Sequence, residues 1–440
     1  MSSQEESVLI IGAGVFGAST AFHLAKTYQD ASKITVIDRT PAPPEPAAST
    51  DINKIIRADY SSAFYADLAY EAMEAWKTWP ELKNYYHQTG WIMLDENSSD
   101  LSTRIRQVFR ERGNDPTSDV PIEDLPKHWN GILKGTNTSG FKTAYFNPEA
   151  GWCDAAAATA GIINAVISKG VNYIVDDVSS LIHKDQRISA IRTESGKEYS
   201  ASKIVFATGA WTSSLLSPLE DLLSIPFSER IERQCTAAGV AVVHYRMSES
   251  QMKELENMPV VVYGEKGEVI PPPGGNRLLK FTNANTFTNN ITISSGHTIS
   301  VPPEGIDQRI VPDILKSEMH SNMTSNVMTQ FSSSEEPEYW RICWDSITPT
   351  QDWLLTKHPD PRLGNLFVAA GGSFHSYKFL PVIGKYMVRV LSGERNGSEK
   401  DRAWGWKGED ERKGGGGAHK STLPKRDLSE IWNVGRGARL

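Results

Sequence analysis

The sequence predicts an α/β protein in which a domain with a buried parallel sheet carries an inserted domain with a mostly antiparallel sheet. Three observations lead to this prediction. A glycine-rich turn follows a buried strand near the amino terminus, and buried strands that also end in glycine return at residues 203–211 and 366–372. Residues 228–303, which lie between them, are rich in β-branched residues, prolines and turns. At 440 residues the chain is long enough for two domains with ample cores.

The amino-terminal glycine turn, within Val8–Gly17, has the pattern of a dinucleotide site. Gly12 permits the tight turn, Gly14 lets the backbone approach a pyrophosphate, and Gly17 lets the following helix pack closely on the strand. The pyrophosphate then lies at the helix N-terminus, where N–H groups without partners favour an anion. The second strand ends in Asp38, which can accept a hydrogen bond from a ribose hydroxyl. The alternative is a βαβ unit of the same pattern without a ligand.

Apolar periodicity predicts the remaining elements in order. Helices are expected over residues 60–79, 98–113 and 154–169. Short alternating strands follow at residues 171–175, 180–183 and 188–193, before the buried strand that ends at Ala207-Thr208-Gly209. The antiparallel region offers strands at residues 241–243, 260–263 and 277–281. A helix is expected over residues 308–331, and the first domain is completed by the strand at 366–372 and a helix over 381–391.

The domains are therefore expected to be interleaved along the chain. The nucleotide-binding domain would be Rossmann-like and discontinuous, with segments at residues 6–90, 150–225 and 336–395. Residues 91–149 and 226–335 would form the substrate domain, and residues 396–440 a carboxy-terminal extension.

Composition excludes several classes of protein. The net charge of −7 argues against nucleic acid or an anionic membrane surface as a partner, and no apolar run reaches the length of a membrane span. Three cysteines without paired spacing, and histidines without a metal-binding pattern, argue against a disulfide scaffold and a zinc site. We expect a soluble monomer or weak dimer in the cytoplasm or the peroxisome, because the final Ala438-Arg439-Leu440 resembles a peroxisomal targeting tripeptide.

Four further motifs point to one family. They are Asp51–Arg57, Leu279–Phe281, Arg341–Trp344 running on to Thr348-Pro349, and Phe374–Lys378. In this order, with the three glycine-ended strands, they resemble FAD-dependent amine oxidases of the sarcosine oxidase type. The chain is most similar to the fungal branch of amadoriases (fructosyl amino acid oxidases) and saccharopine and pipecolate oxidases, over roughly residues 6 to 430.

This resemblance implies an FAD-binding domain of the glutathione reductase and D-amino acid oxidase type. The residues that it places at the cofactor are Gly12, Gly14, Val15, Phe16, Gly17, Asp38, Arg39, Ser49, Thr50, Lys54, Ala207, Thr208, Gly209, Trp211, Cys343, Gly372 and Lys378. Cys343 stands where the family forms a thioether to the flavin 8α-methyl group, which holds the cofactor permanently and raises its potential. A lone cysteine in an apolar strand is otherwise a small core residue.

Lys280 closes an apolar run and precedes a polar stretch that we expect to be a loop, Thr282–Asn285. By resemblance this lysine lies at the flavin ring, where its charge stabilises the superoxide and peroxide formed from dioxygen. A solvent-exposed lysine at a sheet edge is the alternative. Amadori-specific enzymes carry acidic residues shortly after the lysine, whereas this chain has Asn283-Ala284-Asn285, which weakens the case for an Amadori substrate.

Arg57 and Lys378 are the expected carboxylate clamp, since an arginine fork and a lysine charge together hold an amino acid over the flavin. By the same resemblance, Lys54 is a basic residue near the flavin, and Lys407 stands where amadoriases place an arginine that also meets the carboxylate. His375 belongs near the ring, although a core histidine is almost equally compatible with its position. Lys280, Lys54 and His375 are thus the catalytic candidates.

These residues predict an FAD-dependent oxidase of an N-substituted amino acid, amadoriase-like, that forms an imine and reduces O2 to H2O2. The alternatives are a saccharopine, pipecolate or sarcosine type of oxidase, and a tailoring oxidase that acts on an N-methyl or aryl amino acid of a secondary metabolite. An NAD-dependent dehydrogenase leaves Cys343 and the later glycine strands unexplained. A flavoprotein without catalysis leaves the lysines and the arginine unexplained.

Overall fold

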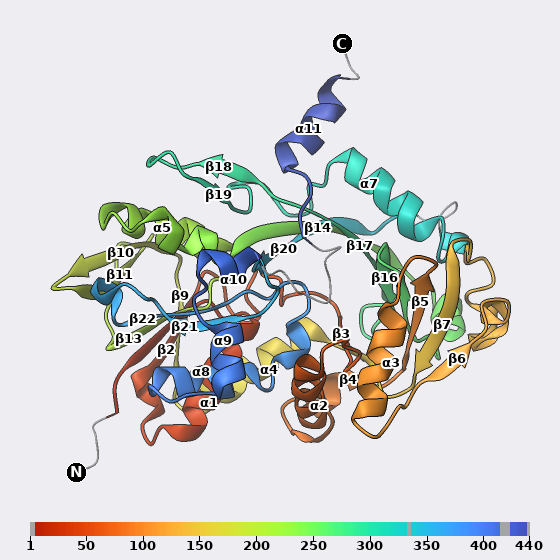
Figure 1. The fold of residues 1–440 in the computed structure, drawn as a ribbon, viewed down its shortest axis with the longest axis horizontal. Coiled ribbons are helices and arrows are strands. Elements are labelled where there is room, and N and C mark those ends of the chain that lie inside the picture. Colours follow the sequence, from red (N-terminus) through yellow and green to blue (C-terminus); the bar gives the residue numbers. More distant parts are fainter. Residues whose placement is uncertain (1–4, 332–335, 414–422, 438–440) are drawn as a thin grey trace.

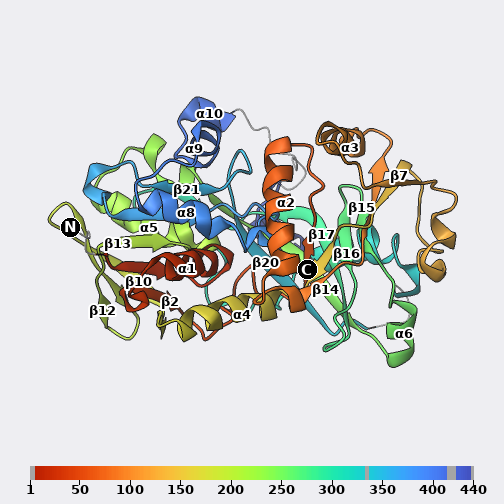
Figure 2. The same ribbon diagram turned by 90° about the horizontal axis from the view of Figure 1, so that it is seen from below.

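The computed structural model describes residues 5–331, 336–413 and 423–437 of the chain. Two large sheets divide the molecule into two halves, and helix α2 (Ala63–Thr78) lies at the boundary between them in both views (Figures 1 and 2). No helix in these ranges has the length and apolar character to cross a membrane.

The first half is built on a six-stranded sheet in the order β21-β22-β13-β1-β2-β9. Neighbouring strands run parallel except at the β21–β22 edge, which is antiparallel. The bounds of these strands are β1 Val8–Ile11, β2 Ile34–Asp38, β9 Asn172–Val175, β13 Lys203–Phe206, β21 Leu354–Lys357 and β22 Leu366–Ala370.

Both faces of this sheet are covered, which explains the uninterrupted apolar run of β1. Val8 and Ile10 belong to the core under α1 (Val15–Thr27), α4 (Ala155–Ser168) and α8 (Ile383–Leu391). Leu9 and Ile11 belong to a separate core on the opposite face, with α5 (Thr212–Leu222) and the small sheet β10 Val178–Lys184, β11 Arg187–Thr193 and β12 Glu198–Tyr199 (Figure 1). A strand buried on both faces has no polar side to show in its sequence.

The second half contains an eight-stranded sheet in the order β20-β14-β17-β16-β15-β5-β7-β6. It is antiparallel except where β15 runs parallel to β5. The bounds are β5 Trp91–Glu96, β6 Ser118–Val120, β7 Phe141–Asn147, β14 Thr236–Arg246, β15 Val260–Tyr263, β16 Gly267–Ile270, β17 Leu278–Phe287 and β20 Tyr339–Ile347.

The remaining elements are short. They are β3 Lys54–Ile56, β4 Tyr86–His87, β8 Gly151–Cys153, β18 Asn290–Thr292, β19 Thr298–Ser300, α3 Leu101–Glu111, α6 Glu249–Glu254, α7 Asp313–Met319, α9 Ser398–Trp404, α10 Glu409–Lys413 and α11 Leu428–Gly437. Strands β3, β4 and β8 form a small antiparallel sheet in which β8 lies between β3 and β4.

The predicted α/β class with a mostly antiparallel second sheet is confirmed, and three details of the prediction are wrong. Strand β20 pairs with β14 in the eight-stranded sheet, although it falls within the segment 336–395 assigned to the nucleotide domain. The helix expected over residues 308–331 is only α7 with a π-helical turn after it, because Pro312 precludes an earlier start. Residues 282–285 are strand rather than loop, since β14 and β16 pair with β17 on its two sides.

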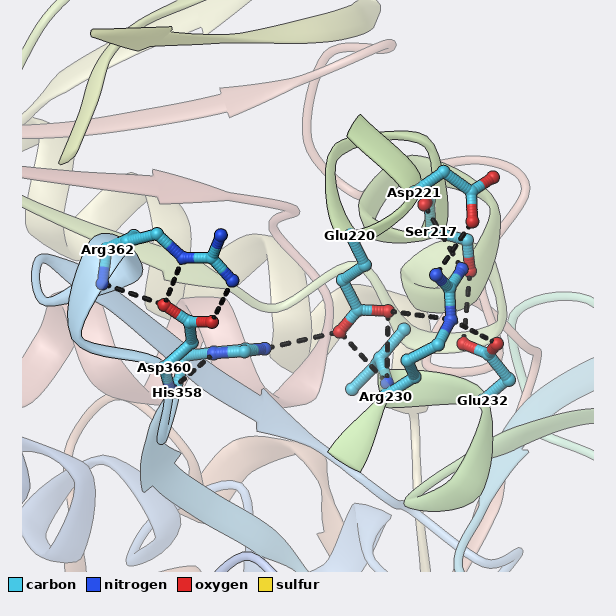
Figure 3. A network of polar contacts seen from close by, with 9 residues as sticks. Ser217, Glu220, Asp221, Arg230, Glu232, His358, Asp360 and Arg362 are labelled. Atoms are coloured by element: carbon cyan, nitrogen blue, oxygen red, sulfur yellow. Dashed lines mark hydrogen bonds and ion pairs between the residues drawn. The ribbon is translucent and has the colours of Figure 1, made fainter. Parts of the chain in front are cut away.

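A buried polar network ties α5 to the loop after β21 (Figure 3). The guanidinium of Arg230 lies 2.6 Å from Glu232 and 2.7 Å from Asp221. Glu220 accepts a hydrogen bond from the backbone N–H of Ile231 and lies 3.2 Å from Nε2 of His358. Arg230, Glu220 and His358 are almost completely buried, so each charge depends on its partners rather than on water.

Candidate active site

The glycine turn at the carboxyl end of β1 forms the floor of a first cleft. Gly12 has a φ of +97°, and a Cβ there would lie 2.4 Å from the carbonyl oxygen of Ala207. A Cβ on Gly17 would lie 1.9 Å from the carbonyl oxygen of Gly12, so this glycine lets α1 pack on the turn rather than lining the cleft. A Cβ on Gly14 would lie 3.3 Å from Oγ of Ser49, so a side chain at this position would narrow the cleft.

Asp38 at the end of β2 lines one edge of the same cleft. Its Oδ2 accepts a hydrogen bond of 2.7 Å from the backbone N–H of Ala13, which fixes the carboxylate beside the glycine turn. Burial raises the pKa of Asp38, although the hydrogen bonds from Ala13 and Thr40 oppose the rise. Next to it, the guanidinium carbon of Arg39 lies 4.6 Å from the ring centroid of Trp211, and both residues line the cleft.

The first cleft, together with the solvent-open space at its mouth, has a volume of about 800 Å³. Of the predicted cofactor residues, those that line it are Gly12, Gly14, Val15, Phe16, Asp38, Arg39, Ser49, Ala207, Thr208, Gly209, Trp211 and Gly372. Thr50 does not, because its hydroxyl turns back to donate to the carbonyl of Pro44. The hydroxyl of Ser49 is buried and has no hydrogen-bond partner among the described residues, and a Cβ on Gly209 would meet nothing within 4 Å. An unpaired donor and open backbone are what a bound phosphate or pyrophosphate requires.

A second cleft, of about 1290 Å³, lies against the eight-stranded sheet. The predicted residues that line it are Lys54, Arg57, Lys280, Cys343, His375 and Lys378. Strand β20 connects the two clefts, because Cys343 lines the second while Trp344 and Asp345 line the first. The loop after β22 does the same with Gly372 and Phe374. A ligand that spans both clefts therefore passes Cys343 on its way.

Asp51 organises the positive charges at this junction. Its Oδ2 lies 2.7 Å from Nζ of Lys280 and 3.3 Å from Nζ of Lys54, and Lys280 also donates to the carbonyl of Asn53 over 2.9 Å. Burial alone would raise the pKa of Asp51, but the two lysines hold it well below its usual range. Nε2 of His244 lies 3.7 Å from the other carboxylate oxygen. Burial lowers the pKa of Lys280, and the charge of Asp51 opposes that fall.

Arg57 and Lys378 meet across the ring of Tyr60. The guanidinium carbon of Arg57 lies 4.7 Å from the ring centroids of Tyr60 and of Trp91. Nζ of Lys378 donates to the hydroxyl of Tyr60 over 3.0 Å and to the carbonyl of His375 over 2.6 Å. Burial, with the charge of Arg57, holds the pKa of Lys378 well below its usual range. An anion bound here would offset that cost, which gives the pair a preference for a carboxylate.

The two remaining candidates, His375 and Lys407, differ in whether they line the second cleft. His375 lines the second cleft, but Nδ1 lies 3.1 Å from the hydroxyl of Tyr60 and Nε2 lies 2.9 Å from the carbonyl of Gln351. Burial lowers its pKa to about 3, so the ring is neutral and fixed in place. Lys407 lines neither cleft, and its ammonium donates to the carbonyl of Ala403. It lies in the loop between α9 and α10, where its backbone N–H donates to Oε1 of Gln234 over 2.9 Å.

With this geometry in view, the chain matches the profile described as "FAD dependent oxidoreductase" over residues 7–390. The chain belongs to the FAD dependent oxidoreductase family. It is 27% identical to L-saccharopine oxidase of Schizosaccharomyces pombe, covering 92% of this chain and 94% of that one. It is 24% identical to the human peroxisomal sarcosine oxidase over 89% and 93% of the two chains. Among solved structures, amadoriase I of Aspergillus fumigatus is 25% identical with a TM-score of 0.81, over 98% and 97% of the chains.

Membership in the FAD dependent oxidoreductase family agrees with the fit of the two clefts. The glycine turn, Asp38 and Ser49 suit the adenosine and pyrophosphate of FAD, and the passage along β20 leads to the lysines around Asp51. The protein is therefore an FAD-dependent oxidoreductase with a second, charged cleft beside the nucleotide cleft.

Sequence reasoning missed four residues that line these clefts, and also Tyr60, which lies between Arg57 and Lys378. Asp51 was only part of a quoted motif, and Asp59, Tyr60, Glu268 and Asp345 were not considered. A buried acid two residues after Arg57, and single acids inside the apolar runs of β16 and β20, are signals that could have found three of them. The pairing of Asp51 with Lys280 has no local signal, because 229 positions separate them.

Proposed function

We propose that this enzyme is an FAD-dependent oxidase of N-substituted amino acids. It oxidises the C–N bond of a secondary amine to an imine, which water hydrolyses to a carbonyl compound and a primary amine, while O2 is reduced to H2O2. One observation carries the proposal: the carboxylate-binding pair Arg57 and Lys378 lies in the same cleft as Lys280 and Cys343, next to the nucleotide cleft.

Arg57 and Lys378 hold the substrate carboxylate. Both are buried and both line the second cleft, so a carboxylate bound there meets two positive charges on one side. The ammonium of Lys378 donates to the hydroxyl of Tyr60 over 3.0 Å, and the guanidinium of Arg57 packs on the ring of Trp91. A clamped carboxylate places the neighbouring nitrogen in one position, which reduces the entropy lost in reaching the reactive geometry.

Lys280 supplies a fixed positive charge at the junction of the two clefts. Bound FAD supplies the two-electron acceptor and passes the electrons to O2. The ion pair with Asp51 and the bond to the carbonyl of Asn53 prevent Lys280 from turning into solvent. A charge that needs no reorganisation stabilises the negative oxygen species that form when O2 is reduced.

Cys343 is proposed to hold the flavin covalently through a thioether. Its side chain is buried with Val240 and Val242 and lines the substrate cleft from β20. Lys54 lines the same cleft, so a positive charge is present on the wall that carries the thiol.

A second candidate is an oxidase of the saccharopine, pipecolate or sarcosine type rather than an amadoriase. The observation that favours it is Ala284, which lies in β17 and lines the cleft where the Amadori-specific enzymes are expected to carry an acid. The similarity to L-saccharopine oxidase points the same way. A tailoring oxidase of an N-methyl or aryl amino acid remains the third candidate.

The proposed setting is a peroxisomal or cytoplasmic monomer or weak dimer that takes a small amino-acid-derived substrate and O2. The targeting tripeptide Ala438–Leu440 lies outside the described residues. The similarity to a peroxisomal sarcosine oxidase, and an H2O2 product, support the peroxisome.

The test is H2O2 release from a panel of sarcosine, pipecolate, saccharopine, fructosyl-glycine, fructosyl-valine and ε-fructosyl-lysine. We expect oxidation of at least one amino acid with a secondary amine, and none of its decarboxylated counterpart. Reduction of the flavin by an amine without a carboxylate at an equal rate would contradict the proposal.

A further inference from the structure

One carboxylate of the substrate cleft has no partner. Glu268 lies in β16, lines the cleft and is half-buried, and its side chain makes no hydrogen bond or ion pair within the described part of the chain. Glu265 also lines the cleft but is exposed to water, and the two buried acids of the cleft have partners. Asp51 is paired with two lysines, and Asp59 accepts hydrogen bonds from Tyr145 and Asn147.

Within the described residues no cation of the cleft contacts Glu268 directly, and its negative charge acts on Lys54, Lys280 and Lys378 only over a longer range. Lys54 and Lys280 are turned toward Asp51, and Lys378 donates to Tyr60 and His375. A half-buried carboxylate that faces a cavity without a direct partner has lost part of its hydration and gained only a longer-range attraction in return. A ligand that carries a positive charge or a hydrogen-bond donor would supply the direct partner that this carboxylate lacks.

The surroundings of Glu268 define what that ligand carries. Five residues on consecutive strands form one row across the cleft face of the sheet, in the order Val242, Thr282, Glu268, Val262 and Met93. Three of them are apolar. The hydroxyl oxygen of Thr282, next to Glu268, is shielded from solvent and also lacks a hydrogen-bond partner. The row therefore offers two acceptors at one point of an otherwise apolar wall, which suits an ammonium on an aliphatic chain.

The position of Glu268 relative to the clamp fixes the length of that chain. Arg57 rests on Trp91 of β5, and β16 lies two strands away from β5 across β15. The row of Glu268 crosses β5 at Met93, the next side chain from Trp91 on that face, so two strand spacings place Glu268 about 10 Å from the part of β5 on which Arg57 rests. A substrate that reaches both has its carboxylate at one end, its secondary amine near that end, and a cation several methylene groups beyond the nitrogen.

We propose that Glu268 is a specificity residue that binds an ammonium group carried on the nitrogen substituent of the substrate. The inference rests on the proposed function for the carboxylate end and adds a second, cationic end. It predicts that the enzyme selects amino acids whose N-substituent is an aminoalkyl chain over those with a neutral chain of equal length.

The test uses two compounds that differ only in the last group. N-(5-aminopentyl)glycine ends in NH3+, and N-hexylglycine ends in CH3 in the same position. In the wild-type holoenzyme we expect kcat/KM to favour the aminopentyl compound about 10-fold, as a charge-assisted hydrogen bond implies. Glu268→Gln should reduce this ratio to near 1 through KM, and Glu268→Asp should restore part of it. Glu254→Gln, an exposed acid of α6, is the matched control and should leave the ratio unchanged.

Binding is measured separately, by anaerobic calorimetry with the same compounds and variants. If both compounds are oxidised with the same ratio in the wild type and in Glu268→Gln, the inference fails and the oxidase function stands. If neither is oxidised but the wild type binds the aminopentyl compound more tightly and Glu268→Gln does not, the oxidase function fails and the cation site stands. Absence of binding of both compounds overturns the cation site.

Discussion

Lys280 and Asp51, which are 229 positions apart, form an ion pair of 2.7 Å in a place from which solvent is almost excluded. Both side chains are only 2% exposed. A buried pair of this kind costs desolvation energy that its attraction only partly returns, so it is weak evidence for stability. Its value here is positional, because it fixes one positive charge where the nucleotide cleft meets the substrate cleft.

The first prediction concerns that charge. In Lys280→Met, reoxidation of the reduced enzyme by O2 should slow about 100-fold, because a preorganised charge matters most where negative oxygen species form. Anaerobic reduction by substrate should change much less. Stopped-flow spectroscopy of the two half-reactions separates them in one preparation. Equal slowing of both would assign Lys280 to substrate positioning instead.

The second prediction is that flavin stays with the wild-type protein after acid precipitation. Cys343 is the cysteine in the cleft, whereas Cys153 and Cys235 are buried without lining it. Cys343→Ala should release the flavin into the supernatant, and Cys235→Ala is the control that should not. Free flavin from the wild type would rule out the thioether.

The third prediction concerns the carboxylate clamp. Arg57→Ala and Lys378→Ala should each lower kcat/KM about 30- to 1000-fold, since each removes a charge-assisted hydrogen bond from a buried site. The double variant should lose less than the sum of the two free energies, because the first loss already loosens the carboxylate. Arg57→Lys keeps the positive charge but loses the planar, two-point hydrogen bonding of the guanidinium. Its kcat/KM should therefore lie between that of the wild type and that of Arg57→Ala. Strictly additive losses, measured on the same substrate, would show that the two residues do not share one carboxylate.

The fourth prediction is a pH dependence that originates in Asp59. Burial raises its pKa to about 6, although Arg57 and the hydrogen bonds from Tyr145 and Asn147 oppose the rise. Below that pH Asp59 is protonated and leaves the charge of Arg57 uncompensated, whereas above it the carboxylate partly neutralises the arginine. A carboxylate inhibitor should therefore bind several-fold more tightly as the pH falls from about 7.5 to about 5.

The inhibitor must not titrate in this range, so an acid such as (methylthio)acetic acid is appropriate. Dissociation constants from the perturbation of the flavin spectrum give the profile. Asp59→Asn should remove the step near pH 6, and persistence of that step would assign it to another group.

The fifth prediction concerns the buried network of Figure 3. Arg230→Met should lower the free energy of unfolding by about 3–5 kcal/mol, because it leaves the buried carboxylates of Glu220 and Glu232 without their cation. Arg246→Met breaks a pair with Glu338 that is roughly half exposed, and should cost less than about 1 kcal/mol. Chemical denaturation of both variants gives the comparison, and equal losses would contradict the importance of the buried network.

Local sequence was sufficient for much of the fold. Burial of one or both faces of an element leaves a pattern of apolar residues in the local sequence. Such patterns were sufficient to predict the glycine turn, β1 and the helices α2, α3, α4 and α8. The same holds for the chemical types in the motifs: an arginine, lysines, a cysteine and a histidine could be named as candidates from their spacing and their family resemblance. Their positions in the two clefts could not.

The tertiary structure decided which of these residues meet. β20 belongs to the second sheet because β14, about a hundred residues earlier, pairs with it, and no pattern within β20 specifies that partner. Likewise, no local pattern shows that Lys407 lies outside the cleft of Arg57 and Lys378, or that Asp51 meets Lys280 across 229 positions. Glu268 shows the limit most clearly. The sequence by itself determined that a carboxylate stands in an apolar strand. Only the packing of β16 between β17 and β15 decided that this carboxylate faces the second cleft without a direct partner. The physical reason is that strand register fixes the direction of a side chain, and distance in space fixes which charges pair.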